Sequence, residues 1–85
     1  MKPVETGVGT AGPLDAIALR EASGAEDDLA EVCPERFRMP AAPSVAAEHE
    51  GRRIDLTRIE ACFDTLVARH SLMLVEGAGG LLVPL

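Results

Sequence analysis

Hydrophobic residues recur at helical spacing in two long stretches of this 85-residue chain. Apolar positions three and four apart predict a helix from Leu14 to Ser23, which Gly24 is expected to end. The same spacing predicts a second helix from residue 56 to about Arg69, with Asp55 as its N-cap. The side of the first helix that we expect to be buried contains Leu14, Ile17, Ala18 and Ala22. The apolar positions of the second helix are Leu56, Ile59, Phe63, Leu66 and Val67.

A different hydrophobic pattern follows the second helix. Residues 72–75 are apolar without alternation, and they end at Glu76 and a glycine cluster. A short unbroken apolar run is typical of a strand buried on both faces of a parallel sheet, where ligands bind beyond the carboxyl ends of the strands. Glu76 stands where a carboxylate can hold a metal ion, and Gly77, Gly79 and Gly80 leave backbone N–H groups open to an anionic oxygen. A strand that ends in a flexible turn, with a solvated Glu76, explains this stretch equally well.

The order of these elements predicts the fold class. A helix that leads by a short turn into a buried strand is the second half of a crossover unit, which indicates an α/β fold with helices flanking a parallel sheet. Residues 1–13 are expected to be extended and loop-like, and 25–53 to be poorly periodic apart from a short helix from Ser44 to Glu50. At 85 residues the chain is short for an α/β domain. We therefore expect residues 1–85 to be part of one larger domain, incomplete at both ends.

Two features near the start of the chain allow a functional and a structural interpretation. Gly7, Gly9 and Gly12 form the pattern G-x-G-x-x-G. Pro13 delays the helix past the last glycine, which favours a mobile glycine-rich loop over a dinucleotide site. Asp15 falls in the first turn of the first helix, where the helix dipole favours a carboxylate. Taken alone, Asp15 is better explained as a first-turn charge or cap than as a second metal ligand.

Composition changes the picture mainly by exclusion. The net charge of −6 argues against a nucleic-acid-binding surface and against attraction to an anionic membrane, and no apolar run approaches the ~20 residues of a membrane span. The acidic run 26–28 is expected to be solvated, and His49 to be exposed. Cys62 is expected in the core and Cys33 in a loop. Their distance in the sequence, without ligand-like spacing, fits a reduced, cytoplasmic setting.

Several segments resemble the dethiobiotin synthetase family in order and spacing. The three that carry the resemblance are Lys2-Pro3-Val4-Glu5-Thr6-Gly7, the helix start Asp15-Ala16-Ile17-Ala18-Leu19, and Glu76-Gly77-Ala78-Gly79-Gly80-Leu81-Leu82-Val83-Pro84-Leu85. The middle of the chain resembles the same family through Phe37, Pro40-Ala41-Ala42-Pro43, Ala46-Ala47 and Glu50-Gly51. E-G-A-G-G also occurs in related ATP-dependent amide-forming enzymes of cobalamin synthesis, so its combination with K-P-V-x-T-G carries the specificity.

The resemblance implies a P-loop-type α/β fold and a homodimer that closes the cyclic urea of dethiobiotin from 7,8-diaminononanoate, carbon dioxide and ATP. By position, Lys2 corresponds to the family's active-site lysine and Thr6 to a substrate-binding hydroxyl. The correspondence for the Mg²⁺–ATP site gives Asp15 and Glu76 as its two carboxylates, and Gly77, Ala78 and Gly79 as its backbone contacts.

The chain departs from the family in one motif. No G-x-x-x-x-G-K-[ST] phosphate loop occurs in the 85 residues, although the family carries one before its K-P-V-x-T-G segment. We therefore expect the complete protein to have the activity of the family, but we do not expect these 85 residues to perform it alone. Two alternatives remain open: part of another ATP-dependent amidoligase of the cobyrinic acid diamide synthase type, and a non-catalytic remnant or interaction module.

Overall fold

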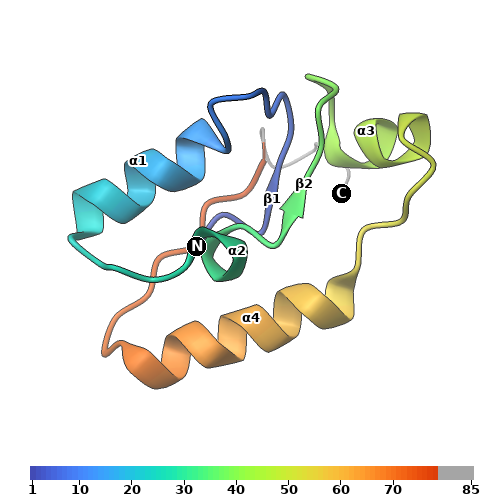
Figure 1. The fold of residues 1–85 in the computed structure, drawn as a ribbon. Coiled ribbons are helices and arrows are strands. Elements are labelled where there is room, and N and C mark those ends of the chain that lie inside the picture. The colour runs from blue at the N-terminus through green and yellow to red at the C-terminus, as the bar shows by residue number, and fades with distance from the viewer. Residues whose placement is uncertain (79–85) are drawn as a thin grey trace.

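A small parallel sheet with helices around it forms the centre of residues 1–78, the part of the chain that the computed structural model describes (Figure 1). The elements in chain order are β1 (Val4–Glu5), α1 (Leu14–Ser23), α2 (Leu29–Val32), β2 (Glu35–Arg36), α3 (Pro43–His49) and α4 (Leu56–Arg69). The three longer helices lie close to the bounds expected from the sequence, whereas α2 and β2 were not expected. The α/β class with a helix-flanked parallel sheet is confirmed.

The two strands are parallel, with Val4 opposite Glu35 and Glu5 opposite Arg36. Backbone hydrogen bonds continue the pairing beyond the strands: the Lys2 N–H donates to the Val32 carbonyl at 2.8 Å, and the Val8 N–H donates to the Phe37 carbonyl at 2.9 Å. The sheet is therefore held along most of residues 2–8, and these bonds fix the segment that carries Lys2 and Glu5.

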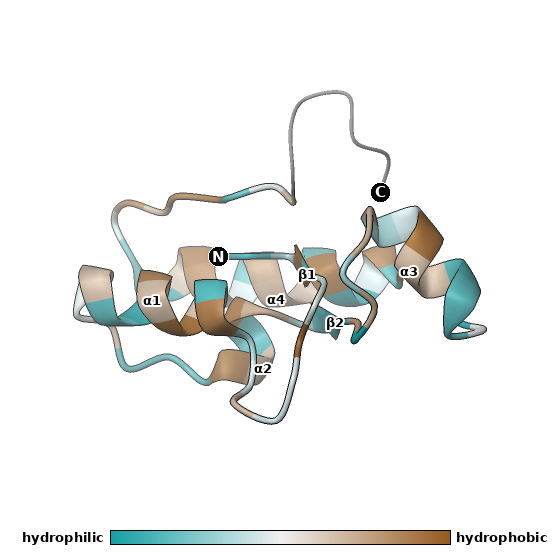
Figure 2. Ribbon diagram, turned by 90° about the horizontal axis from the view of Figure 1, so that it is seen from above, coloured by the Kyte–Doolittle hydropathy of each residue, from teal (hydrophilic) through white to brown (hydrophobic). Residues whose placement is uncertain are grey.

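The apolar run 72–75 differs from expectation, because it is neither a strand nor buried. Leu72 and Leu74 are 78% and 77% exposed. Two hydrogen bonds join this segment to one residue: the Met1 nitrogen donates to the Leu74 carbonyl at 2.7 Å, and the Glu76 N–H donates to the Met1 carbonyl at 2.9 Å. This alternation around one residue is that of a parallel pair, but one residue does not make a ladder. Figure 2 shows the run as a brown length of coil outside the helices and strands.

The core consists of two small clusters. One contains Val4, Phe37, Ala46 and Ala47. The other contains Ala16, Val32 and Cys33, and it joins α1 to α2. Alanines of α1 and α3 contribute to both clusters, and Phe37 is the largest fully buried side chain among residues 1–78.

The buried side expected for α1 is wrong. Leu14 is 62% exposed, Ala18 and Ala22 are exposed, and Ile17 is half-buried, whereas the fully buried residue of this helix is Ala16. In α4, Leu66 is buried, but Leu56, Phe63 and Val67 are 65%, 39% and 44% exposed. Helical spacing identified both helices correctly. Which of their apolar residues are covered depends on neighbours that the spacing does not specify.

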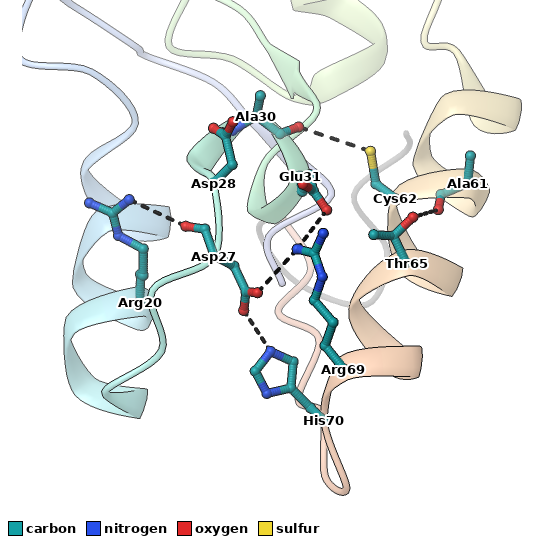
Figure 3. A network of polar contacts seen from close by, with 10 residues as sticks. All are labelled: Arg20, Asp27, Asp28, Ala30, Glu31, Ala61, Cys62, Thr65, Arg69 and His70. Atoms are coloured by element: carbon teal, nitrogen blue, oxygen red, sulfur yellow. Dashed lines mark hydrogen bonds and ion pairs between the residues drawn. The ribbon is translucent and has the colours of Figure 1, made fainter.

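The end of α4 is attached to the segment before α2 by charged side chains (Figure 3). Asp27 accepts from Arg69 Nη1 at 3.5 Å, and its other oxygen lies 2.6 Å from His70 Nε2. Glu31 also accepts from Arg69 Nη1, at 3.2 Å. The side chain of Asp27 is only 12% exposed. The acidic run 26–28 is therefore solvated only in part, because its central residue binds the last turn of α4.

Several remaining features of the structure follow the sequence. Gly9 and Gly12 form an isolated antiparallel bridge in a turn, and α1 begins only after Pro13, so the glycine pattern does not open a helix. Asp55 caps α4 by accepting from the Arg58 N–H, and His49 is exposed. No helix among residues 1–78 is long and apolar enough to cross a membrane.

Candidate functional site

Three charged side chains from distant parts of the chain meet at the start of β1. Lys2 Nζ donates to Asp15 Oδ2 at 3.1 Å and to Glu76 Oε1 at 3.2 Å, and it also donates to the Gly77 carbonyl at 3.4 Å. The lysine side chain is 5% exposed, whereas those of Asp15 and Glu76 are 59% and 50% exposed. A buried ammonium thus supports two carboxylates that face solvent.

The charge on Lys2 is stable at neutral pH. Burial by itself lowers the pKa of this ammonium, but its hydrogen bonds and ionic contacts with Asp15 and Glu76 outweigh that effect and raise the pKa above 10.5. Lys2 is the only lysine among the 85 residues, so the site has no second ammonium of this kind.

The position of Asp15 is set by a residue that the sequence analysis did not single out. Glu5, which is 6% exposed, accepts from the Asp15 N–H at 3.1 Å and from the Ala16 N–H at 2.9 Å. Pro13 occupies the N-cap position of α1 and provides no side-chain hydrogen bond. Asp15 is a charge in the first turn of α1, as expected, but it is not the helix cap: Glu5 is the cap, and the Asp15 carboxylate is directed to Lys2. A proline at an N-cap position, together with a glutamate in the preceding strand, was the available signal.

Of the other expected site residues, Glu76 lies in the cluster, whereas Thr6 and Ala78 do not take part in its described contacts. Glu76 reaches Lys2 because its own N–H is bonded to the Met1 carbonyl. Thr6 is half-buried, and within residues 1–78 no hydrogen bond joins its side chain to this cluster. Ala78 likewise makes none of the cluster's contacts, while Gly79 lies outside the described residues.

The two carboxylates fit a hard divalent cation. Their oxygens already converge on one positive group, Lys2 Nζ, and both side chains keep an exposed face. Mg²⁺ is commonly held by one or two carboxylates, with water and phosphate oxygens completing its shell. Residues 1–78 contain no cluster of three or more acidic, histidine or cysteine ligands, so within this part of the chain Asp15 and Glu76 are the two side chains that we assign to such an ion.

A family model described as an AAA domain matches residues 1–85, which is the whole chain. The chain belongs to this AAA-domain family. Membership in the AAA-domain family agrees with the parallel sheet and its flanking helices, so the P-loop-type fold class is confirmed.

Curated relatives narrow the similarity. The chain is 49% identical over 85 residues to the ATP-dependent dethiobiotin synthetase BioD of Anaeromyxobacter dehalogenans strain 2CP-C. It is 35% identical over 85 residues to the protein of the same name from Methanococcus vannielii, and 43% over 89 residues to that of Aromatoleum aromaticum. The resemblance drawn from the K-P-V-x-T-G and E-G-A-G-G segments is therefore confirmed. The whole chain is covered in each case, and it spans 38%, 38% and 40% of those relatives.

Proposed function

We propose that the protein carrying this chain is an ATP-dependent dethiobiotin synthetase, which closes a cyclic urea from 7,8-diaminononanoate and carbon dioxide. The observation that carries the proposal is the meeting of Asp15 and Glu76 on Lys2 Nζ, at 3.1 and 3.2 Å, in a chain similar throughout to proteins of that name. These residues bring together the charges that phosphoryl transfer requires, because that reaction depends on positioning and neutralisation more than on covalent chemistry from the protein.

The proposed reaction has three balanced steps. One amine of the substrate attacks carbon dioxide and loses a proton, which gives a carbamate. A carbamate oxygen attacks the γ-phosphorus of ATP, and ADP leaves. The second amine then attacks the carbamoyl carbon and loses a proton, the C–O bond to phosphate breaks, and inorganic phosphate leaves as the ring closes.

Lys2 is the residue that we assign to the developing negative charge. Its ammonium is buried and protonated, so it neutralises the carbamate oxygen and the transferred phosphoryl group without giving up its proton. Asp15 and Glu76 would hold Mg²⁺, which when bound neutralises phosphate charge. With their carboxylates engaged by the ion, Asp15 and Glu76 would compete less for the Lys2 ammonium, which would then be available to the substrate.

Other assignments complete the proposal by position. Thr6 binds the diamine substrate through its hydroxyl, and the backbone of Gly77, Ala78 and Gly79 contacts the nucleotide. We also propose that the complete protein is a cytoplasmic homodimer. These assignments follow the similarity to the named relatives.

The test is formation of labelled dethiobiotin from ¹⁴C-bicarbonate, 7,8-diaminononanoate and Mg²⁺–ATP by the full-length protein. Lys2→Met keeps the length of the side chain and removes its charge, and we expect it to lower kcat by about 100-fold or more. Arg58→Met is the matched control, because Arg58 is an exposed cation of α4 far from this site in the sequence. Absence of labelled product from the wild-type protein, or normal turnover by Lys2→Met, would contradict the proposal.

A further inference from the structure

Glu5 joins β1 to the first turn of α1 through both oxygens of a buried carboxylate. Oε2 accepts from the Asp15 N–H and Oε1 from the Ala16 N–H. These are the second and third residues of α1, whose N–H groups an N-cap side chain usually binds. Pro13 cannot provide that bond, so a residue eight positions earlier does so from the sheet.

This arrangement closes a ring of contacts around the candidate site. Lys2 and Glu5 belong to one extended segment that the sheet holds in place. Glu5 fixes the backbone of Asp15, and the carboxylate of Asp15 returns to Lys2 Nζ at 3.1 Å. Asp15 is thus held from two directions by the same segment. A conventional cap at position 13 would stabilise the helix without tying it to β1.

We propose that Glu5 is a positioning residue for Asp15: it sets the distance between the first turn of α1 and the start of β1, and so the place where the Asp15 carboxylate meets a cation. Glu5 itself touches neither substrate nor metal. The expected change in turnover rests on the proposed function. The contacts between Glu5 and α1 are independent of that function.

Glu5→Gln is the main variant, because it keeps the size of the side chain and loses one of the two acceptor oxygens. Glu35→Gln is the matched control. Glu35 is a glutamate of the neighbouring strand that is 4% exposed, against 6% for Glu5, and within residues 1–78 no hydrogen bond joins it to α1.

Two measurements on the full-length protein separate the possible roles. We expect amide hydrogen exchange at Asp15 and Ala16 to rise about fivefold in Glu5→Gln, because a cap is lost. The Mg²⁺ concentration for half-maximal ATP turnover should rise about tenfold, as is typical when a partner that orients a ligand is removed. At saturating Mg²⁺, kcat should change much less. Glu35→Gln should leave both quantities unchanged.

A second variant distinguishes positioning from simple helix stabilisation. Pro13→Ser places a conventional N-cap side chain before α1, and it is examined alone and together with Glu5→Gln. We expect the double variant to recover slow amide exchange while its Mg²⁺ requirement stays high. Recovery of both would show that Glu5 only stabilises the helix and would overturn the proposal, as would unchanged exchange or an unchanged Mg²⁺ requirement in Glu5→Gln.

The two proposals fail in different ways. A wild-type protein that does not turn over ATP contradicts the proposed function. The role of Glu5 is then decided by Mn²⁺, which should broaden the Ala16 amide signal less in Glu5→Gln than in the wild type or in Glu35→Gln. Equal broadening in all three proteins would overturn the role of Glu5.

Discussion

At the scale of single residues, the candidate site consists of one buried cation and two partly exposed carboxylates. Lys2 is buried, while its partners Asp15 and Glu76 are half exposed. Since the ammonium is buried and the two carboxylates are half exposed, the carboxylates are the groups that a ligand can reach from solvent. A cation that enters from solvent meets them first and competes with Lys2 for their oxygens.

The carboxylates should act as one unit in the full-length protein. Asp15→Asn and Glu76→Gln each keep the shape of the side chain and remove a charge, and each should lower turnover by about 100-fold or more, since neutralisation of phosphoryl charge contributes several kcal/mol. Raising the Mg²⁺ concentration should restore part of the lost turnover. The double variant should be far less than multiplicatively worse.

Steady-state kinetics over a range of Mg²⁺ concentrations checks this prediction. Asp64→Asn is the control, because it removes an exposed carboxylate from α4. Near-normal turnover in a folded Asp15→Asn or Glu76→Gln protein would remove that residue from the metal site.

Cys33 provides a second prediction at this scale. Its thiol is fully buried, and burial, assisted by the charge of Glu5, raises its pKa from 9.0 to about 11. The folded protein therefore holds this proton more tightly than the unfolded chain does. The stabilisation is complete below about pH 9 and is lost as the pH rises through about 11, with a free energy on the order of 2 kcal/mol.

Urea unfolding of the full-length protein at pH 8 and pH 11 measures this loss. Cys33→Ala removes the titrating group and leaves a small side chain in the same cluster, so its stability should fall less over that range. If wild type and Cys33→Ala lose the same amount, the thiol is not the source.

At the scale of elements, charged side chains attach two of the helices: Lys2 and Glu5 hold the first turn of α1, and a second cluster holds the end of α4. Asp27 binds both Arg69 and His70, and Glu31 of α2 binds Arg69 (Figure 3). His70 begins the segment that leads to Glu76. The cluster therefore holds the start of the segment whose far end reaches the candidate site.

Removing the shared carboxylate tests this attachment. Asp27→Asn should lower the free energy of unfolding by up to about 1 kcal/mol, as is usual for partly exposed ion pairs, and salt should reduce the difference. Glu26→Gln is the control, since Glu26 precedes Asp27 in the sequence and its carboxylate is exposed. Denaturant unfolding at low and high salt gives both values. If both variants lose the same free energy of unfolding, the cluster does not stabilise α4.

At the scale of the whole molecule, residues 1–78 leave much apolar surface uncovered. Leu72, Leu74 and Val75 are exposed beside the sheet, and α4 exposes Leu56 and Val67. The described sheet has two strands, and a sheet of that size is marginally stable in water. Uncovered edges and apolar side chains also favour association.

We therefore expect the 85-residue chain, expressed by itself, to be marginally folded and prone to associate. It should also bind Mg²⁺–ATP weakly, because its sequence has no phosphate-loop motif. Calorimetry and light scattering check both points. A sharp thermal transition from a monomer, or micromolar affinity for Mg²⁺–ATP, would contradict this prediction.

The elements whose causes are local could be predicted from the sequence. The bounds of α1 and α4 follow from apolar spacing together with Gly24 and Asp55, and the φ of 69° at Gly24 shows why a glycine stands there. The family resemblance was also local in this sense, since it depended on short segments in order. Lys2, Asp15 and Glu76 were identified in that way before their distances were known.

Burial, and the contacts that support the site, depend instead on how distant segments pack against each other. Leu14 and Leu72 are as apolar as any core residue, yet they are exposed because no described element covers them. Glu5 and Glu35 are charged but buried, and of the two only Glu5 meets the free N–H groups of α1. Burial and long-range capping depend on which segments lie next to each other, and the periodicity of one segment carries no information about its neighbours.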